Sequence, residues 1–320
     1  MKKLSFIILL LLFPLQVFAY SNKLIVKGNP IGIEIHSNGV YIIDFYKINN
    51  HYIGKEAGFR IGDQILEVNH QKINSINELN KEINKEENYT VTIKRNNQIK
   101  EIDIVPKKEN NVLKTGLYVK DEINGIGTLS YIDPETKIYA SLGHEILESS
   151  SMQLFDTSHG YIYEAELNGI KKSKDGLIGE YQASFNNQIL GTINNNDKTG
   201  IFGKYQDPLK EETLIEVASK DEILKGTAYI RMNMGEEKDY EINILSISEK
   251  DPVKNIFFEI KDDALLQETG GIVQGMSGSP MIQNNKIIGV VNYVVINEPN
   301  KGYGIFIETM LEEGDKLLQE

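Results

Sequence analysis

Apolar and polar positions alternate in short stretches along most of the chain. Residues 31–35 and 89–93 alternate with a period of two, which is typical of strands with one buried face. Residues 75–85 instead place three aliphatic side chains at helical spacing, behind Ser75 as the N-cap and Glu78 at the capping-box position. Together these patterns predict a small α+β domain over residues 23–106.

The pattern changes after a polar linker at residues 106–111. From Val112 onward, short apolar strands such as 138–142 and 287–291 are separated by turns rich in Gly, Asn and Asp. Strands at this spacing predict an all-β sandwich or barrel of about 200 residues, with a helix only in the tail at 308–318.

The first nineteen residues have the plan of a secretory signal. A basic start at residues 1–3 precedes a largely apolar run that Pro14 and Gln16 interrupt, and Ala19 offers a small residue for cleavage. The run is short for a membrane span of about 20 residues, so a cleaved signal peptide and an uncleaved signal anchor remain the two interpretations of residues 1–19. Both predict that the rest of the chain is exported.

Composition narrows the chemistry that this chain can perform. The 320 residues carry a net charge of −12, which argues against binding nucleic acid. The absence of cysteine excludes disulfides, a thiol nucleophile and Cys-ligated zinc. Five histidines are spread along the chain without a paired-ligand motif. We therefore expect neither a metal nor an organic cofactor.

The stretch 270–280, Gly-Gly-Ile-Val-Gln-Gly-Met-Ser-Gly-Ser-Pro, is the most informative one. Glycines around Ser277 let the backbone turn sharply, expose the hydroxyl and leave peptide N–H groups free. By analogy with serine proteases, the N–H groups of Gly275 and Ser277 would form an oxyanion hole. A hydroxyl needs a base within hydrogen-bond reach, and His144, at a predicted strand end beside a glycine, is the best candidate.

Two alternatives stay open at this level. Glycine- and serine-rich turns are common in β proteins, and a histidine near a strand end often has only a structural role. Ser279 is a rival nucleophile, although its position before Pro280 favours a role in orienting the turn. Residues 280–291 are expected to form a hairpin directly after the serine.

The sequence resembles a known family at this point. Gly-Met-Ser-Gly-Ser-Pro at 275–280 resembles the nucleophile motif of chymotrypsin-like proteases. The longer stretch 270–280, with 142–144, 200–203 and 302–305, is similar to the stage IV sporulation protein B (SpoIVB) serine peptidase family. Residues 55–73 resemble a PDZ domain, which that family carries before its protease domain. The resemblance implies a mainly β chain, with a PDZ-like α+β domain at 23–106 and a chymotrypsin-like double β-barrel at 112–320.

The resemblance also implies roles for individual residues. Ser277 would be the nucleophile and His144 the base, and the aspartate fifteen residues before the serine, Asp262, would orient the base. Asp262 either reaches His144 from a different strand or shapes the substrate site instead. Asp133 and Asp156 are weaker candidates for the orienting carboxylate.

A peptide-binding role is implied for the PDZ-like domain. Such domains add a peptide strand to a sheet edge and capture its C-terminal carboxylate. The position of the family's carboxylate loop corresponds to Ile31, Gly32 and Ile33, where Gly32 would permit close backbone approach or merely relieve a strand turn.

Members of the family are secreted into the space between forespore and mother cell. There they cleave themselves and a protein that regulates a membrane-embedded metalloprotease, which leads to processing of pro-sigma-K. The resemblance implies this role, a membrane-associated or intercompartmental location and these protein partners for the present chain. Two alternatives are an envelope quality-control protease of the HtrA type, whose PDZ domain usually follows the protease, and a non-catalytic PDZ signalling scaffold.

Overall fold

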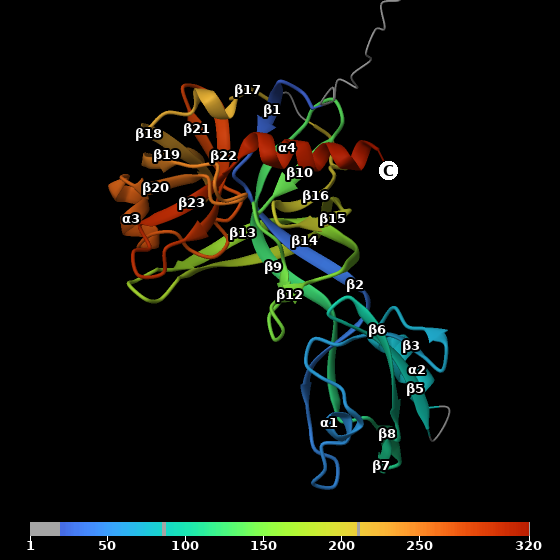
Figure 1. Ribbon diagram of the computed structural model, residues 1–320. Helices are drawn as coiled ribbons and strands as arrows, with labels where there is room; N and C mark the ends of the chain where they lie inside the picture. Colours follow the sequence, from blue (N-terminus) through green and yellow to red (C-terminus); the bar gives the residue numbers. More distant parts are fainter. Residues whose placement is uncertain (1–19, 85–87, 210–211, 320) are drawn as a thin grey trace, which may run out of the picture.

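Two closed rings of antiparallel strands form the larger part of the chain, and a smaller α+β unit extends from the first ring (Figure 1). The computed structural model describes residues 20–84, 88–209 and 212–319. Strands account for 55% of the residues and helices for 12%, so the prediction of a mainly β chain is confirmed.

Six strands form the first barrel, each hydrogen-bonded to the next around the ring. In spatial order they are β2 (Pro30–Phe45), β9 (Leu117–Ile132), β10 (Ile138–Ser141), β16 (Gly200–Lys204), β14 (Glu180–Ile193) and β13 (Thr157–Lys171). A bridge between Gly191 and Tyr205 joins β14 to the end of β16 and closes the ring. Three short strands flank it: β1 (Lys23–Val26), β15 (Asn195–Asp197) and β17 (Leu214–Val217).

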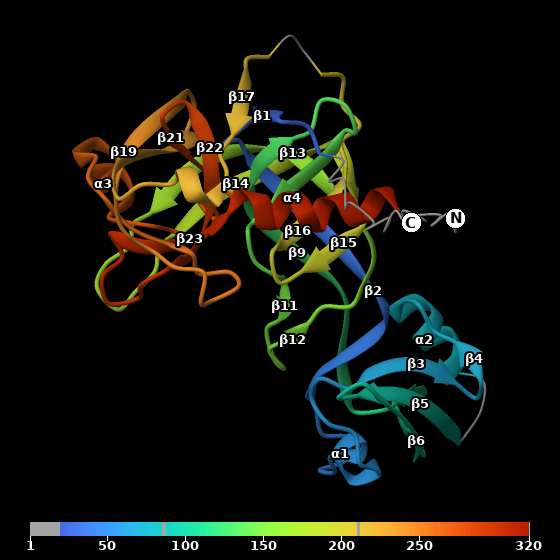
Figure 2. The ribbon, with the colours of Figure 1, turned by 45° about the horizontal axis from the view of Figure 1, so that its top comes forward.

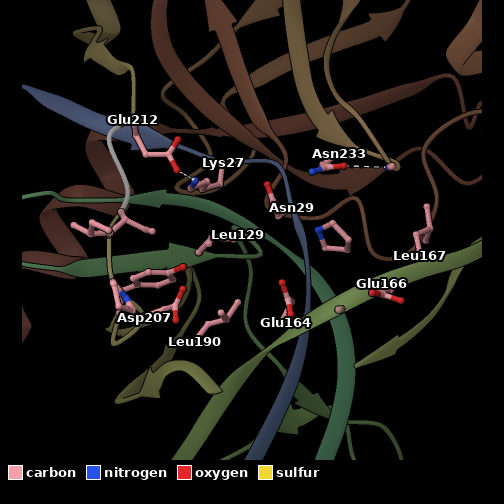
Figure 3. A pocket seen from close by; sticks show the side chains of 17 residues that line it. Lys27, Asn29, Leu129, Glu164, Glu166, Leu167, Leu190, Asp207, Glu212 and Asn233 are labelled. Atoms are coloured by element: carbon pink, nitrogen blue, oxygen red, sulfur yellow. Dashed lines mark hydrogen bonds and ion pairs between the residues drawn. The ribbon is translucent and has the colours of Figure 1, made fainter. Parts of the chain in front are cut away.

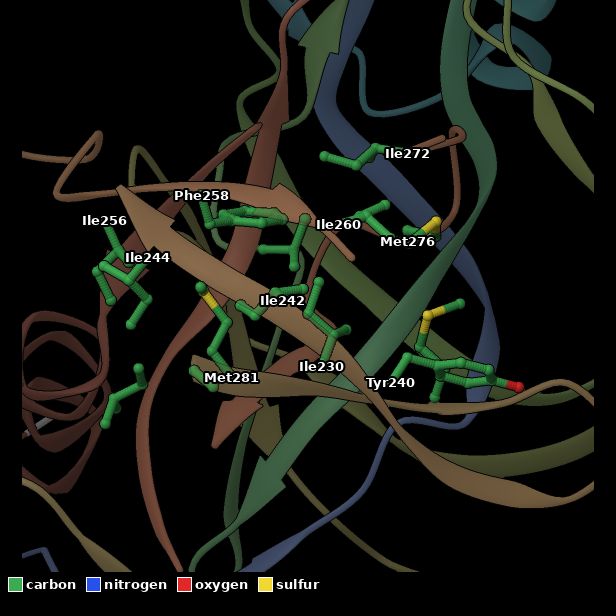
Figure 4. Close-up of a cluster of buried hydrophobic side chains, with 14 of the residues drawn as sticks. Ile230, Tyr240, Ile242, Ile244, Ile256, Phe258, Ile260, Ile272, Met276 and Met281 are labelled. Carbon is green, nitrogen blue, oxygen red and sulfur yellow. The ribbon is translucent and has the colours of Figure 1, made fainter. Parts of the chain in front are cut away.

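The second barrel also closes on itself with six antiparallel strands. In spatial order they are β18 (Gly226–Asn233), β19 (Glu237–Ile247), β20 (Ile256–Ile260), β23 (Lys301–Phe306), β22 (Lys286–Val294) and β21 (Pro280–Gln283). Alternate residues of these strands point inward and fill the interior with Ile, Phe and Met side chains, including Ile242, Phe258 and Met281 (Figure 4). Met276, from the predicted nucleophile turn, is part of the same core, which anchors that turn to the barrel.

The hairpin predicted directly after the serine turn is the β21–β22 pair. Asn284 and Asn285 connect the two strands with φ values of 53° and 61°. Positive φ at both central residues is the geometry of a two-residue turn that matches strand twist, and asparagine tolerates it well.

Helices cover the barrels at few points. α3 (Asp263–Thr269) lies between β20 and the serine turn in sequence, and a 3-10 turn, η1, spans Lys220–Glu222. The tail helix predicted at 308–318 is α4 (Ile307–Asp315), followed by a 3-10 turn, η2 (Lys316–Leu318). α4 contacts β10 of the first barrel and β22 of the second, so it ties the two barrels together (Figure 2). Within the described ranges, no helix is long and apolar enough to cross a membrane.

The smaller unit has the α+β composition that the sequence predicts. The second half of β2 pairs with β3 (Gln64–Val68), β3 pairs with β5 (Tyr89–Arg95), and β5 pairs with β6 (Gln98–Ile104). The remaining elements are α1 (Ile53–Ala57), β4 (Gln71–Lys72), α2 (Ile76–Ile83), β7 (Lys107–Glu109) and β8 (Val112–Lys114). Ser75 caps α2 by accepting a hydrogen bond from the Glu78 amide at 3.2 Å, as the capping pattern predicts.

The boundary between this unit and the barrels differs from the expected one. β2 and β9 run from one unit into the other: residues 30–36 of β2 pair within the first barrel, and residues 41–45 pair within the smaller unit. β1 also pairs with β9 and β17. Residues 23–36, predicted to belong to the N-terminal domain, are therefore part of the barrel body, because their pairing partners lie far along the chain. The predicted signal at 1–19 lies outside the described residues.

A short hairpin links the first barrel to the smaller unit. Its strands are β11 (Leu147–Glu148) and β12 (Gln153–Leu154), and it extends from the first barrel toward the smaller α+β unit (Figure 2). Just after it, the amide of Asp156 donates to the Tyr41 hydroxyl at 3.0 Å, and the Asp156 carboxylate pairs with Lys94 at 3.0 Å. The hairpin begins three residues after His144, so the same segment reaches both units.

Candidate active site

The turn that carries Ser277 depends on two glycines in conformations that other residues rarely adopt. Gly275 and Gly278 have φ values of 103° and 96°. A Cβ at Gly278 would lie 2.3 Å from the carbonyl oxygen of Thr128, so the backbone approaches β9 more closely than a side chain allows. The Gly278 amide donates to the Val291 carbonyl at 2.7 Å, which holds the turn against β22.

This turn exposes one serine and buries the other. Ser277 is half-buried and lines a cavity, whereas Ser279 has no solvent-exposed surface. The Ser279 hydroxyl has no hydrogen-bond partner among the described residues. A substrate carbonyl can therefore approach Ser277 but not Ser279.

Two peptide N–H groups beside the serine are available to a ligand. Within the described part of the chain, the amides of Gly275 and Ser277 donate to no other group. Their carbonyls are held from the other side: the Thr128 hydroxyl donates to Gly275 at 2.6 Å, and the Thr128 amide donates to Ser277 at 3.1 Å. Fixed carbonyls with unpaired N–H groups are what a preorganised oxyanion hole requires.

His144 lies on a loop with unusual backbone geometry. Leu142 and Gly143, the two residues before it, have φ values of 72° and 73°, and for leucine this region is sterically costly. Asn196 holds the loop in place, because its side chain accepts from the Ile146 amide at 2.8 Å and donates to the Ile146 carbonyl at 3.0 Å. The sequence gives no signal for this role of Asn196, which lies in the polar stretch Asn-Asn-Asn-Asp-Lys at 194–198.

The imidazole of His144 is arranged to accept a proton. Its Nδ1 lies 2.8 Å from the carbonyl oxygen of Glu145, and since a carbonyl can only accept, Nδ1 carries the hydrogen and Nε2 has the free lone pair. Burial lowers the pKa of His144 below its ordinary value, so the ring is neutral at pH 7. The ring of Tyr293 packs beside it with a centroid separation of 5.6 Å. Burial and, secondarily, the Glu145 carboxylate raise the pKa of Tyr293 to about 12.

Ser277 and His144 line the same cavity, of about 430 Å³, between the two barrels. The Ser277 hydroxyl donates to the Asn292 carbonyl at 3.4 Å, and no hydrogen bond joins it to His144 in residues 20–84, 88–209 and 212–319. Catalytic hydrogen bonds are often long or absent without substrate. To engage the base, the Ser277 hydroxyl has to give up its bond to the Asn292 carbonyl.

The structure does not bring Asp262 to His144. Asp262 is the N-cap of α3, and its carboxylate accepts a hydrogen bond from the Leu265 amide at 2.9 Å. The expectation that it orients the base is not met here, because the Nδ1 position is taken by the Glu145 carbonyl. The weaker candidates are also engaged elsewhere: Asp133 accepts from Ser21, and Asp156 pairs with Lys94.

The predicted peptide-binding residues Ile31, Gly32 and Ile33 are not at an open sheet edge. They lie in the barrel half of β2, where β9 pairs with one edge and β13 with the other. A peptide strand has no free edge to join, so this prediction is wrong. Gly32 has a packing role, because a Cβ there would lie 2.3 Å from the Phe185 ring.

A second cavity, of about 490 Å³, lies along the first barrel (Figure 3). Carboxylates dominate its charged lining, and the one lysine, Lys27, pairs with Glu212 at 2.5 Å. No serine, threonine or histidine is among the described residues that line it. This cavity therefore offers no serine–histidine pair, whereas the cavity lined by Ser277 and His144 does.

Two barrels that meet at a half-buried serine and a neutral histidine have the architecture of serine endopeptidases, which here is joined to a PDZ domain. Comparison with protein families agrees: residues 110–311 match the family described as SpoIVB peptidase S55, and residues 30–105 match the PDZ domain. The first match spans more than half of the chain. The chain belongs to the SpoIVB peptidase S55 family.

Two solved structures are similar to part of this chain. The Rv3671c protease from M. tuberculosis in its active form is 15% identical, with a TM-score of 0.33; the match covers 59% of this chain and 71% of that one. An inactive mutant form of Rv3671c is also 15% identical with a TM-score of 0.33, over 61% of this chain and 82% of that one. No curated protein matches the chain.

Proposed function

We propose that Ser277 is the nucleophile, His144 the general base, and the amides of Gly275 and Ser277 the oxyanion hole of this peptidase. Nε2 of His144 takes the hydroxyl proton as the serine oxygen attacks the peptide carbonyl. The carbonyl oxygen gains negative charge and accepts from the two amides. His144 then returns the proton to the leaving amine, and water hydrolyses the acyl-enzyme by the same route.

The observation that carries this proposal is the joint placement of Ser277 and His144 in one cavity, beside two unpaired amides. The Glu145 carbonyl takes the place usually held by an orienting carboxylate, because it fixes the same tautomer of the base. Losing one oxyanion-hole donor in a serine protease costs about 10²–10³ in rate, so the turn geometry matters as much as the hydroxyl.

The test compares Ser277→Ala with Ser279→Ala in the full chain. Labelling by a fluorophosphonate and the appearance of fragments in intact mass spectra are followed over time. We expect the parent and Ser279→Ala to label and to fragment alike, because the Ser279 hydroxyl contacts no partner among the described residues. Ser277→Ala should do neither. A Ser277→Ala protein that still labels would refute the assignment, and an unreactive parent would favour a PDZ scaffold.

We further propose that the chain acts in sporulation signalling as an exported peptidase. Its substrates would be itself and a protein that restrains a membrane-embedded metalloprotease, so that its activity leads to pro-sigma-K processing. The family to which it belongs supports this role, and the apolar N-terminal stretch supports export. The PDZ domain supports a protein or peptide partner.

This role is tested in sporulating cells that carry the Ser277→Ala allele. We expect pro-sigma-K to stay unprocessed and the regulator to stay intact, while the wild-type and Ser279→Ala alleles restore both. Normal processing in the Ser277→Ala strain would contradict the signalling role but not the peptidase activity measured in vitro.

A further inference from the structure

The cavity at Ser277 and His144 has an apolar wall that the catalytic steps do not use. Six aliphatic residues form this wall: Ile33, Ile123, Ile126, Leu142, Ile146 and Leu147. Ile33 and Leu142 belong to the core of the first barrel, and Ile123 and Ile146 pack against it. Glu145 is the one charged residue among the described lining residues, since His144 is neutral at pH 7. The recess is therefore suited to an uncharged, apolar group.

The wall is on the side of the base, not on the side of the oxyanion hole. Leu142, Ile146 and Leu147 come from the loop that carries His144, and the other three residues come from β2 and β9 of the same barrel. The acyl-side elements, Gly275 and Ser277, precede β21 of the second barrel. Because the base returns its proton to the leaving amine, the leaving half of a substrate lies next to His144.

The recess is open to solvent and large enough for a side chain. Its volume of about 430 Å³ falls within the usual range of ligand pockets, about 300–1,000 Å³. Gly125 forms part of the rim, and a Cβ at that position would meet no atom within 4 Å. Ile126, next to it, is half-buried and also lines the cavity.

We propose that this recess is a specificity subsite for an aliphatic side chain on the leaving-group side of the scissile bond. The inference rests on the proposed function of Ser277 and His144 and adds the class of substrate. An acidic side chain is excluded because its charge would lie against an aliphatic wall and beside the Glu145 carboxylate, without a partner.

The experiment measures specificity with the full chain and a defined mixture of unstructured peptides, with the cleaved bonds read by mass spectrometry. We expect Leu, Ile or Val directly after the cut to raise kcat/KM about ten- to hundredfold over Asp, the range that apolar pockets provide. In Ile126→Asp, cleavage before Leu should fall and cleavage before Lys or Arg should rise. The rise shows that the variant is folded and active.

Ile189→Asp is the matched control, because Ile189 is 41% exposed on β14 and does not line the recess. It should keep the parent profile. Cleavage that ignores the residue after the cut, or an Ile126→Asp profile like that of the parent, would overturn the subsite while leaving Ser277 as nucleophile. No cleavage together with no fluorophosphonate labelling of Ser277 would overturn the proposed function and the subsite with it.

Discussion

Replacing Asp262 by asparagine separates two roles that this residue could have, the N-cap of α3 and the carboxylate that orients His144. Asparagine keeps the cap and removes the charge. In the structure, the Asp262 carboxylate accepts from the Leu265 amide at 2.9 Å and begins α3. Asparagine is as good an N-cap as aspartate, so Asp262→Asn should leave the unfolding free energy nearly unchanged. Asp262→Ala removes the cap and should lower the free energy of unfolding by about 1 kcal/mol.

The effect on catalysis is the sharper measurement. Removing the carboxylate that orients the base of a serine-protease triad lowers kcat by about 10⁴. Here the tautomer of His144 is set by the Glu145 carbonyl, so the kcat of Asp262→Asn should stay within about threefold of the parent, as for a residue outside the catalytic unit.

The assay is the initial rate of peptide cleavage, with each sample normalised by its folded fraction in urea. Asp263→Asn is the matched control, because Asp263 is an exposed acid in the first turn of the same helix and is not its N-cap. A loss of kcat by about 10⁴ in Asp262→Asn, with an unchanged unfolding midpoint and an active Asp263→Asn, would refute the reasoning. It would mean that Asp262 reaches His144 in the catalytic conformation.

Three further outcomes follow from the geometry. Asn196→Ala should lower kcat and should lower the free energy of unfolding by about 1–3 kcal/mol, because it leaves the backbone groups of Ile146 in the His144 loop unpaired. Asn186→Ala, at an exposed position, should change neither quantity. An Asn196→Ala protein with the kcat of the parent would contradict this prediction. Burial lowers the pKa of His144, so kcat/KM should not change with pH near pH 7. In more acidic solution kcat/KM should fall tenfold per pH unit, with a midpoint lower than 6.5. A midpoint above 6.5 would argue against His144 as the base. Gly278→Ala should lower the melting temperature strongly and abolish cleavage, because the added Cβ would clash with the backbone of Thr128. Gly125→Ala should leave the melting temperature unchanged, because a Cβ there meets no atom within 4 Å. Equal melting temperatures of the two variants would show that the serine turn can shift.

The same His144 shift has a consequence for folding stability. The unfolded chain binds a proton at this site with the ordinary pKa of 6.5, and the folded chain binds it only at lower pH. Between the two values the unfolded state holds more protons, so acidification through this window destabilises the fold. Urea midpoints measured from pH 7 downward should therefore drop less in His144→Gln than in the parent.

Several features of this protein follow from local sequence alone. The serine turn depends on φ values that glycine tolerates, the start of α2 depends on the Ser75 cap, and the β21–β22 hairpin depends on two asparagines with positive φ. Each is a property of a few consecutive residues, so periodicity and turn chemistry are enough to find it. Ser277 and His144, which we propose as nucleophile and base, stand out by such local signals.

Other features, such as the strand neighbours of residues 31–33 and the partner of Asp262, depend on contacts between distant segments. Residues 31–33 alternate like an edge strand, yet both of their edges are taken by β9 and β13, whose positions the local pattern does not encode. Asp262 carries the same N-cap signal that marks Ser75, but only the path of α3 shows that its carboxylate is used there. Asn196 holds the His144 loop through bonds to Ile146, fifty residues away, and such bonds form only when the first barrel brings the two segments together.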